Sequence, residues 1–199
     1  VVENVRGVPN ETHVSRVEAS PFEAGTAYVT FDGHRTDDHK PYVYVTKEFG
    51  ETWTSISSNL PEGNANVITA SNRNRNLLFL GTEYAVYVSL DAGKSWKRFM
   101  QGLPTVRIDD IVIHPRERDL VIGTHGRSIW IVDDISPLEQ MTDQTTTQDA
   151  VLFDTRPATS WLTDIQKQIT VGSAKHFRGA NAEPGTAIAY WLKSDANSV

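Results

Sequence analysis

The chain has 199 residues, a formal net charge of −6 and no cysteine. The lack of cysteine excludes disulfides, thiolate catalysis and cysteine-ligated metals, and the acidic balance disfavours nucleic-acid binding, which requires clustered basic surface. A hydrophobic content of 39% and a charged content of 22% are ordinary for a globular protein. No apolar run approaches the roughly 18 residues of a membrane span, so the sequence predicts no membrane-spanning helix.

One motif is present in two copies and organises the chain. Residues 89–96 read S-x-D-x-G-x-x-W between two alternating segments, which is typical of a hairpin with turn residues at its centre. Asp91 can accept hydrogen bonds from backbone N–H groups across the turn, and Gly93 can adopt positive φ. A weaker copy of the motif lies upstream at residues 46–53, where Trp53 precedes Trp96 by 43 residues. The residues given a structural role in the two copies are Ser89, Asp91, Gly93 and Trp96, and Glu48, Gly50 and Trp53.

Segments rich in β-forming residues recur around these motifs with a period of about 40–45 residues, which is typical of repeat architectures. The predicted strands of the first unit are Val14–Ala19, Thr26–Phe31, Tyr42–Thr46 and Thr52–Ile56. Those of the second unit are Val67–Ala70, Leu77–Thr82, Ala85–Ser89 and Ser95–Phe99. The third unit has only three, at Ile108–Ile113, Asp119–Thr124 and Ser128–Val132. We therefore expect three antiparallel units within residues 1–141, the last of which takes its fourth strand from another part of the chain.

The pattern changes after this repeat region. A short helical turn is expected at Pro137–Met141, and the polar residues 142–150 read as a linker. Residues 151–199 contain two further predicted strands, Gln168–Val171 and Ala187–Leu192. About 50 residues are few for an independent domain. We therefore expect residues 151–199 to be the start of a second, truncated all-β domain of the β-sandwich type, in a piece of a longer protein.

The repeat resembles the Asp-box, or BNR-repeat, β-propellers, a module shared by sialidases, sortilin-type receptors, xyloglucan-cleaving glucanases and a photosystem assembly factor. The chain resembles in particular large bacterial sortilin-like proteins labelled "glycosyl hydrolase, BNR repeat". The stretches that carry this resemblance are Asp37–Tyr44 leading into Gly50–Trp53, Gly123–Trp130 leading into Asp133–Leu138, and Phe177–Lys193. The resemblance implies an all-β partial propeller of about three four-stranded blades. It says less about activity, because function belongs to sites rather than folds.

Topology directs the search for a binding site away from the Asp-box. In an antiparallel blade, the turn between strands 2 and 3 and the connection from strand 4 to the next strand 1 lie at the end opposite the Asp-box turn. Propeller ligands usually bind at that end, around the central channel. The candidate binding residues there are His34, Arg35, Glu83, Tyr84, Arg107, His125 and Arg127. An arginine can bind a carboxylate through two parallel hydrogen bonds. The alternative is that these residues form only hairpin salt bridges and solvated loops.

Catalysis and metal binding have weaker candidates. Glycoside hydrolysis needs two carboxylates that flank the sugar bond, about 5–5.5 Å apart for retention and roughly 6.5–9.5 Å apart for inversion. Asp109 or Asp110 together with Glu83 is the pair that the sequence offers. A calcium ion could be bound by oxygens of Asp32, Asp37 and Asp38, although their spacing matches no standard loop. We otherwise expect no cofactor.

Two functional interpretations follow. The first is a non-catalytic scaffold that binds a protein or glycan partner through its 2–3 hairpins, within a larger exported assembly. The remaining blades would come from the same longer chain or from another chain, and the expected location is periplasmic, envelope-associated or extracellular. The alternative is a glycoside hydrolase that acts on a polysaccharide. A scaffold predicts carboxylates held in ion pairs, whereas hydrolysis predicts two carboxylates that face each other across a cleft lined with exposed aromatics.

Overall fold

A computed structural model describes residues 5–157 and 185–195. The chain divides into two compact units, Val1–Asp143 and Gln144–Val199, and each is described by itself. None of the helices among the described residues is long and apolar enough to cross a membrane. The predicted strand at residues 168–171 lies outside the described residues.

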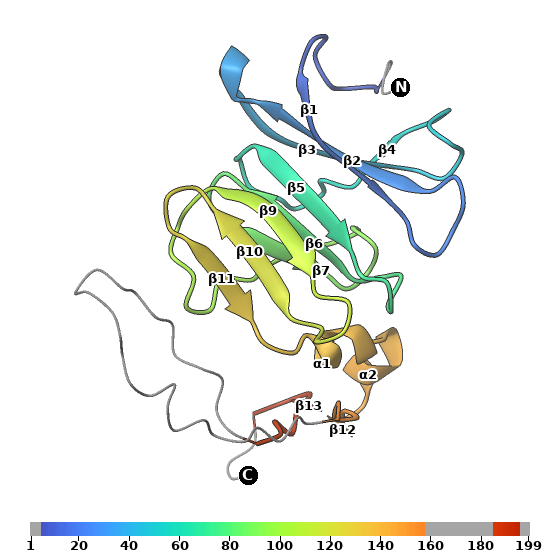
Figure 1. Cartoon of the computed structure of the whole chain (residues 1–199). Coiled ribbons are helices and arrows are strands. Elements are labelled where there is room, and N and C mark those ends of the chain that lie inside the picture. Colours follow the sequence, from blue (N-terminus) through green and yellow to red (C-terminus); the bar gives the residue numbers. More distant parts are fainter. Residues whose placement is uncertain (1–4, 158–184, 196–199) are drawn as a thin grey trace, which may run out of the picture. The chain divides into compact units, whose positions relative to one another are not determined.

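The first unit is a row of three antiparallel sheets, or blades (Figure 1). Blade 1 consists of β1 (His13–Ala19), β2 (Ala27–Gly33), β3 (Asp38–Thr46) and β4 (Thr54–Ser55), paired in that order. Blade 2 consists of β5 (Ala65–Ala70), β6 (Leu78–Thr82), β7 (Val86–Ser89) and β8 (Lys97–Arg98), also paired in order. Blade 3 consists of β9 (Ile108–Ile113), β10 (Leu120–Thr124) and β11 (Ile129–Val132). The predicted partial propeller of about three blades is confirmed.

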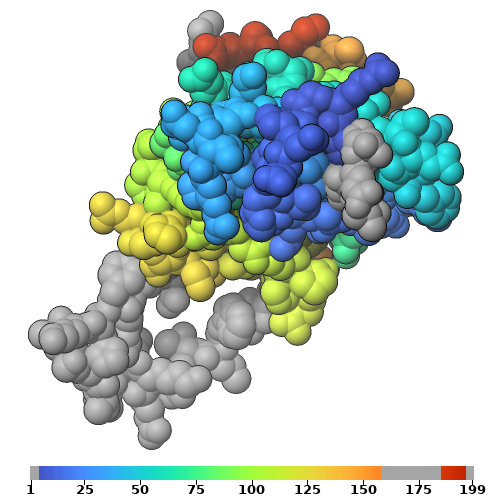
Figure 2. Space-filling view, turned by 90° about the horizontal axis from the view of Figure 1, so that it is seen from above, coloured from blue at the N-terminus to red at the C-terminus, as the bar shows by residue number. Residues whose placement is uncertain are grey.

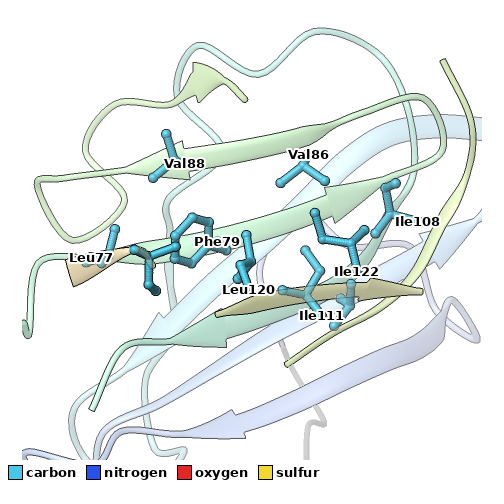
Figure 3. Close-up of a cluster of buried hydrophobic side chains, with 10 residues drawn as sticks. Leu77, Phe79, Val86, Val88, Ile108, Ile111, Leu120 and Ile122 are labelled. Carbon is cyan, nitrogen blue, oxygen red and sulfur yellow. The ribbon is translucent and has the colours of Figure 1, made fainter. Parts of the chain in front are cut away.

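The blades stack through their apolar faces. Between blades 1 and 2, Tyr28 and Val43 pack with Ile68 and Leu80. Between blades 2 and 3, the core is larger, and Figure 3 shows its side chains meeting between the two sheets. Its labelled members are Leu77, Phe79, Val86, Val88, Ile108, Ile111, Leu120 and Ile122. Burial of these aliphatic and aromatic side chains is the main source of stability, at about 1.5–3 kcal/mol for each fully buried side chain.

The fourth strands are shorter than the sequence predicts. They span only Thr54–Ser55 and Lys97–Arg98. Before β8, the backbone N–H groups bond to side chains instead of to a neighbouring strand. The Ser95 N–H donates to Asp91 Oδ1 at 2.9 Å, and the Trp96 N–H donates to Asn59 Oδ1 at 2.8 Å. Asn59 also donates from Nδ2 to the Trp96 carbonyl at 2.8 Å, so that residue fixes the entry to β8 from the previous blade.

The Asp-box turn of blade 2 is closed by its own side chains. Asp91 accepts hydrogen bonds from Ser89 Oγ at 2.7 Å and from Ser95 Oγ at 2.5 Å. The Gly93 N–H donates to Ser89 Oγ at 2.8 Å, with Gly93 at φ 87°. The Trp96 indole crosses to blade 1, where Nε1 donates to the Ile56 carbonyl at 2.7 Å. The Asp-box hairpin is thus a joint between two blades.

The weaker copy in blade 1 forms the same kind of turn with different donors. The Gly50 N–H donates to Thr46 Oγ1 at 3.0 Å, and Thr52 Oγ1 donates to Glu48 at 2.8 Å. The indole Nε1 of Trp53 is buried, and the described residues offer it no acceptor. Among the described residues, the hydrogen bond that joins blade 2 to blade 1 therefore has no counterpart from Trp53.

The third blade ends in a short helix in place of an Asp-box hairpin. Helix α1 (Ser136–Gln140) lies where the sequence predicts a helical turn, and its Glu139 carboxylate is buried in an ion pair with Arg118. Helix α2 (Asp143–Thr147) lies within the stretch read as a linker. In the second unit, β12 (Ala150–Leu152) pairs antiparallel with β13 (Tyr190–Leu192).

Candidate binding face at the 2–3 hairpins

The loops between second and third strands lie at one end of the blades. In Figure 1 the β2–β3 and β10–β11 connections both lie toward the upper left, with the one-turn 3-10 helix His34–Thr36 at the tip of the first. Figure 2 shows the light-blue surface around this turn on the face seen from above. We call this end the 2–3 face. It consists of the three 2–3 hairpins and the residues that lead into β5 and β9.

A chain of charged side chains joins blade 1 to blade 3 across this face. Asp32, which is only 4% exposed, pairs with His34 Nδ1 at 2.7 Å and with Arg107 at 3.6 Å. Arg107 Nε in turn donates to Asp109 at 2.8 Å, and the other Asp109 oxygen lies 3.2 Å from His125 Nδ1. Five of the predicted site residues, Asp32, His34, Arg107, Asp109 and His125, therefore meet in one sequence in which carboxylates alternate with arginine and histidine side chains.

Asp32 is the buried centre of this chain. Burial by itself would raise the Asp32 pKa, but hydrogen bonds from the His34 backbone and ring, together with the Arg107 charge, outweigh burial and hold that pKa below its usual value. The carboxylate is therefore ionised at neutral pH. It serves as a fixed anion that positions the His34 ring from its own blade and the Arg107 guanidinium from blade 3.

A second cluster links blade 1 to blade 2. His39 Nδ1 lies 3.5 Å from the Glu83 carboxylate, and the buried Asn64 Nδ2 lies 3.4 Å from each of them. Asn64 Oδ1 accepts the Gly33 N–H at 3.2 Å. The side chain of Asn64 thus ties the β2–β3 hairpin to the β6–β7 hairpin.

Asn64 is the residue that the sequence analysis misses. It occupies the same place in blade 2 as Arg107 does in blade 3, because the two residues are 43 positions apart and each directly precedes the first strand of its blade. The backbone repeats the relation, since the Asn64 carbonyl accepts the Glu83 N–H at 3.0 Å and the Arg107 carbonyl accepts the His125 N–H at 2.9 Å. The repeat period applied to Arg107 would have identified it.

The three acidic residues weighed for catalysis are all engaged with cationic or hydrogen-bonding partners. Asp109 pairs with Arg107 and His125, Asp110 pairs with Arg16 at 3.2 Å, and Glu83 lies beside His39. Asp110 thus forms its ion pair with blade 1 and does not share a partner with Glu83, the residue with which the sequence analysis pairs it.

Three predicted residues stand outside these clusters. Arg35 and Arg127 are exposed, and the described residues offer neither guanidinium a carboxylate partner. Tyr84 is half exposed next to Gly63 and joins no cluster. These side chains are accessible to an incoming molecule, whereas those of the clusters are already partnered.

The candidate calcium ligands do not converge. Asp32 belongs to the buried chain, Asp37 lies 3.4 Å from His39, and Asp38 accepts a hydrogen bond of 2.6 Å from the Tyr42 hydroxyl. This hydrogen bond lowers the Asp38 pKa by more than burial raises it, so the pKa lies below its usual value. Among the described residues there is no group of three or more such side chains that could hold a metal ion.

The fold and the 2–3 face define a propeller-type protein. The chain matches the family described as "Sortilin-Vps10: Sortilin, neurotensin receptor 3" over residues 41–175, more than half of its length. The chain belongs to this family. The predicted likeness to sortilin-type Asp-box propellers is therefore confirmed.

Solved structures share the fold. A GH74 enzyme of Niastella koreensis superposes with a TM-score of 0.50 at 19% identity, covering 61% of this chain and 21% of that one. An ancestral GH74 enzyme gives a TM-score of 0.49 at 22% identity, with 58% of this chain and 14% of that chain covered. YCF48 bound to a D1 peptide gives 0.41 at 19% identity, with 60% and 36% covered. This chain thus corresponds to about a third or less of these proteins, and the likeness shows the fold alone. A search of curated proteins found no match.

Proposed function

We propose that this chain is part of a non-catalytic propeller scaffold that binds a protein or glycan partner through its 2–3 face, within a larger exported assembly. The observation that carries the proposal is the ion-pair chain His34–Asp32–Arg107–Asp109–His125, which connects hairpins of two blades. Such a chain holds the exposed loops in one arrangement, and a pre-arranged surface loses less entropy when a partner binds.

The proposal also rests on what the carboxylates do. A general acid for glycoside hydrolysis needs a raised pKa and access to the glycosidic oxygen. Asp109 instead accepts a hydrogen bond from Arg107 at 2.8 Å, and Glu83 lies 3.5 Å from His39, so both carboxylates already have partners within the 2–3 face. The unpartnered guanidinium groups of Arg35 and Arg127 are better suited to contact an incoming carboxylate or carbonyl group.

Export is part of the proposal and is supported by membership in the sortilin family. A cysteine-free chain is compatible with an oxidising compartment, because it has no thiol to be mispaired. Fractionation of the source cells with an antibody to this chain tests the location. Recovery of the protein only with cytosolic markers would contradict this part of the proposal.

Binding is tested on the purified chain with a phage-displayed peptide library and an array of neutral and acidic polysaccharides. The face variants are His125→Ala and Arg127→Ala. Arg98→Ala is the matched control, because Arg98 is an exposed arginine in β8, outside the 2–3 face. A selected ligand should lose about tenfold or more in affinity with Arg127→Ala, corresponding to one charge-assisted contact of about 1.4 kcal/mol, and nothing with the control. If Arg127→Ala and the control Arg98→Ala weaken binding of the selected ligand equally, the 2–3 face is not the site.

The catalytic alternative is tested separately with xyloglucan as substrate. The chain should release reducing sugar no faster than the buffer blank does. Release that is above the blank and disappears in Asp109→Asn or Glu83→Gln would make the chain a glycoside hydrolase and overturn the scaffold proposal.

A further inference from the structure

The hairpin between β6 and β7 is the shortest of the three 2–3 hairpins and the most tightly held. Three residues lie between β6 and β7, whereas four lie between the corresponding strands of blades 1 and 3. The Thr82 hydroxyl accepts the N–H groups of Tyr84 at 3.3 Å and of Ala85 at 3.2 Å. The Glu83 N–H donates to the Asn64 carbonyl at 3.0 Å. The backbone of both residues at the tip of this hairpin is therefore fixed by buried groups.

Tyr84, at the tip of this hairpin, rests on a glycine. A Cβ added to Gly63 would lie 3.2 Å from Tyr84 Cδ2 and 3.5 Å from Cε2, and Gly63 has φ 140°. Gly63 is buried, and its N–H donates to the His39 carbonyl at 2.8 Å. Tyr84 itself is 48% exposed. One side of the ring is thus supported by fixed backbone, while about half of the residue stays open to solvent.

Side chains that form hydrogen bonds lie beside this ring. Glu83 precedes Tyr84 in the hairpin, and its Oε2 atom lies 3.5 Å from His39 Nδ1 and 3.4 Å from Asn64 Nδ2. Within the described part of the chain, the other carboxylate oxygen of Glu83 accepts no hydrogen bond. The side chains of Glu83 and His39 are 25% and 44% exposed. Both can therefore reach the hydroxyl groups of a molecule that lies on the Tyr84 ring.

The isolation of this ring distinguishes between classes of ligand. Among the described residues of the three 2–3 hairpins, Tyr84 is the only large hydrophobic residue that is exposed. A protein partner is usually anchored by several clustered side chains in a desolvated patch, and a quaternary ammonium ion is held in a cage of several aromatic rings. One ring bordered by hydrogen-bonding groups instead fits a pyranose. The apolar C–H face of the sugar packs on the ring, and its hydroxyl groups reach the side chains at the edge.

The charges around Tyr84 favour a neutral sugar. Glu83 is its neighbour in sequence, the exposed Glu62 is the neighbour of Gly63, and Asp37 is 98% exposed and lies 3.4 Å from His39 Nε2. An anionic sugar would therefore approach the ring past three carboxylates that repel it. A neutral sugar meets the same carboxylates as hydrogen-bond acceptors for its hydroxyl groups.

We infer that Tyr84, Glu83 and His39 form a subsite for a neutral glycan on the 2–3 face. The sugar ring stacks on Tyr84, and its hydroxyl groups bond to the Glu83 carboxylate and to the His39 imidazole. The inference rests on the proposed function, because it selects the glycan from the two kinds of partner and gives it a place on the face. Gly63 is a positioning residue for this subsite, since a side chain there would displace the Tyr84 ring.

Isothermal titration calorimetry of the 199-residue chain with cellohexaose, maltohexaose and mannohexaose tests the inference, with hexagalacturonate as the acidic probe. At least one neutral hexasaccharide should bind. Tyr84→Ala should weaken its binding about tenfold or more, whereas Tyr84→Phe, which keeps the ring, should weaken it about threefold or less. Phe49→Ala is the control, because Phe49 is an exposed aromatic residue in the Asp-box hairpin at the other end of blade 1; it should leave the affinity unchanged.

Three results would overturn the inference: no neutral hexasaccharide binds, Tyr84→Ala leaves the affinity unchanged, or hexagalacturonate binds more tightly than the neutral sugars. Failure of the proposed function gives a different pattern. If the sugars do not bind but a phage-selected peptide loses affinity in Tyr84→Ala, the 2–3 face still binds a partner, and that partner is a protein. If neither sugars nor peptides respond to Tyr84→Ala or Arg127→Ala, the proposed function fails as well. Tyr84 is exposed, so its replacement leaves the cores between the blades intact.

Discussion

The two Asp-box tryptophans should differ in how much stability is lost when each is replaced by phenylalanine. Trp96 is 3% exposed, and its Nε1 donates to the Ile56 carbonyl at 2.7 Å across the joint between blades 1 and 2. In Trp96→Phe the carbonyl of Ile56 loses its donor, which costs about 1–3 kcal/mol for a buried group. The smaller ring also leaves a void, which adds about 1 kcal/mol. We expect the free energy of unfolding to fall by about 2–4 kcal/mol.

Trp53→Phe starts from a different balance. The Trp53 Nε1 is buried and has no acceptor among the described residues, so its removal relieves a desolvated donor by about 1–3 kcal/mol. This gain offsets the smaller contact area of the phenylalanine ring. The free energy of unfolding should change by about 1 kcal/mol or less.

Urea unfolding of the 199-residue chain, followed by far-UV circular dichroism, measures both variants without relying on tryptophan fluorescence. Equal m-values would show that the variants and the parent unfold over the same surface. The reasoning is refuted if Trp53→Phe destabilises the chain as much as Trp96→Phe does. That result would mean that the joint depends on ring packing and that the indole hydrogen bond contributes nothing measurable.

Three further predictions follow from single side chains. Because the Asp32 pKa is lowered in the folded state, its ionised form stabilises the fold above its unfolded pKa of about 3.9, and this contribution is lost as pH falls through the lower folded pKa. Asp32→Asn should therefore weaken the pH dependence of the urea midpoint below about pH 4. Glu139→Gln breaks the buried pair with Arg118 and should cost about 3 kcal/mol in urea unfolding; an unchanged midpoint would show that the pair contributes nothing. Phe49 has φ 55° and a side chain that is 83% exposed, so Phe49→Gly should raise the thermal midpoint by relieving about 1 kcal/mol of strain, and a lower midpoint would show that its ring packing matters more.

The fold could be predicted because its signals are local and repeated. The spacing of Trp53 and Trp96 sets the period, and the loss of the motif after Asp133 marks the blade without a fourth strand. The fourth strands were predicted too long because alternation does not show which backbone groups are free for pairing. Ser95 and Trp96 look like strand residues, but their N–H groups are taken by Asp91 and by Asn59.

The candidate site could be predicted only in part, because its links join residues that are distant in sequence. Topology places His34, Arg107 and His125 at one end of the blades, but nothing in the sequence shows that Asp32 lies between two of them. Asp32 instead read as a metal ligand next to Asp37 and Asp38. A carboxylate in an acidic loop has the same local signature whether a cation from another blade or a metal ion neutralises it.

The two ends of a blade also differ in what their carboxylates can do. A general acid or base needs a pKa near the working pH and a free position for the substrate. Burial would raise the Asp91 pKa, but hydrogen bonds from Ser95 and Ser89 outweigh it and hold the pKa below its usual value. Both Asp91 oxygens are occupied by those donors, which belong to the turn itself. Asp109 at the 2–3 face is instead paired with solvent-exposed side chains that come from another hairpin, such as His125. A partner could replace such a contact without unfolding a hairpin, and that difference is why the proposed binding site lies at the 2–3 face and not at the Asp-box.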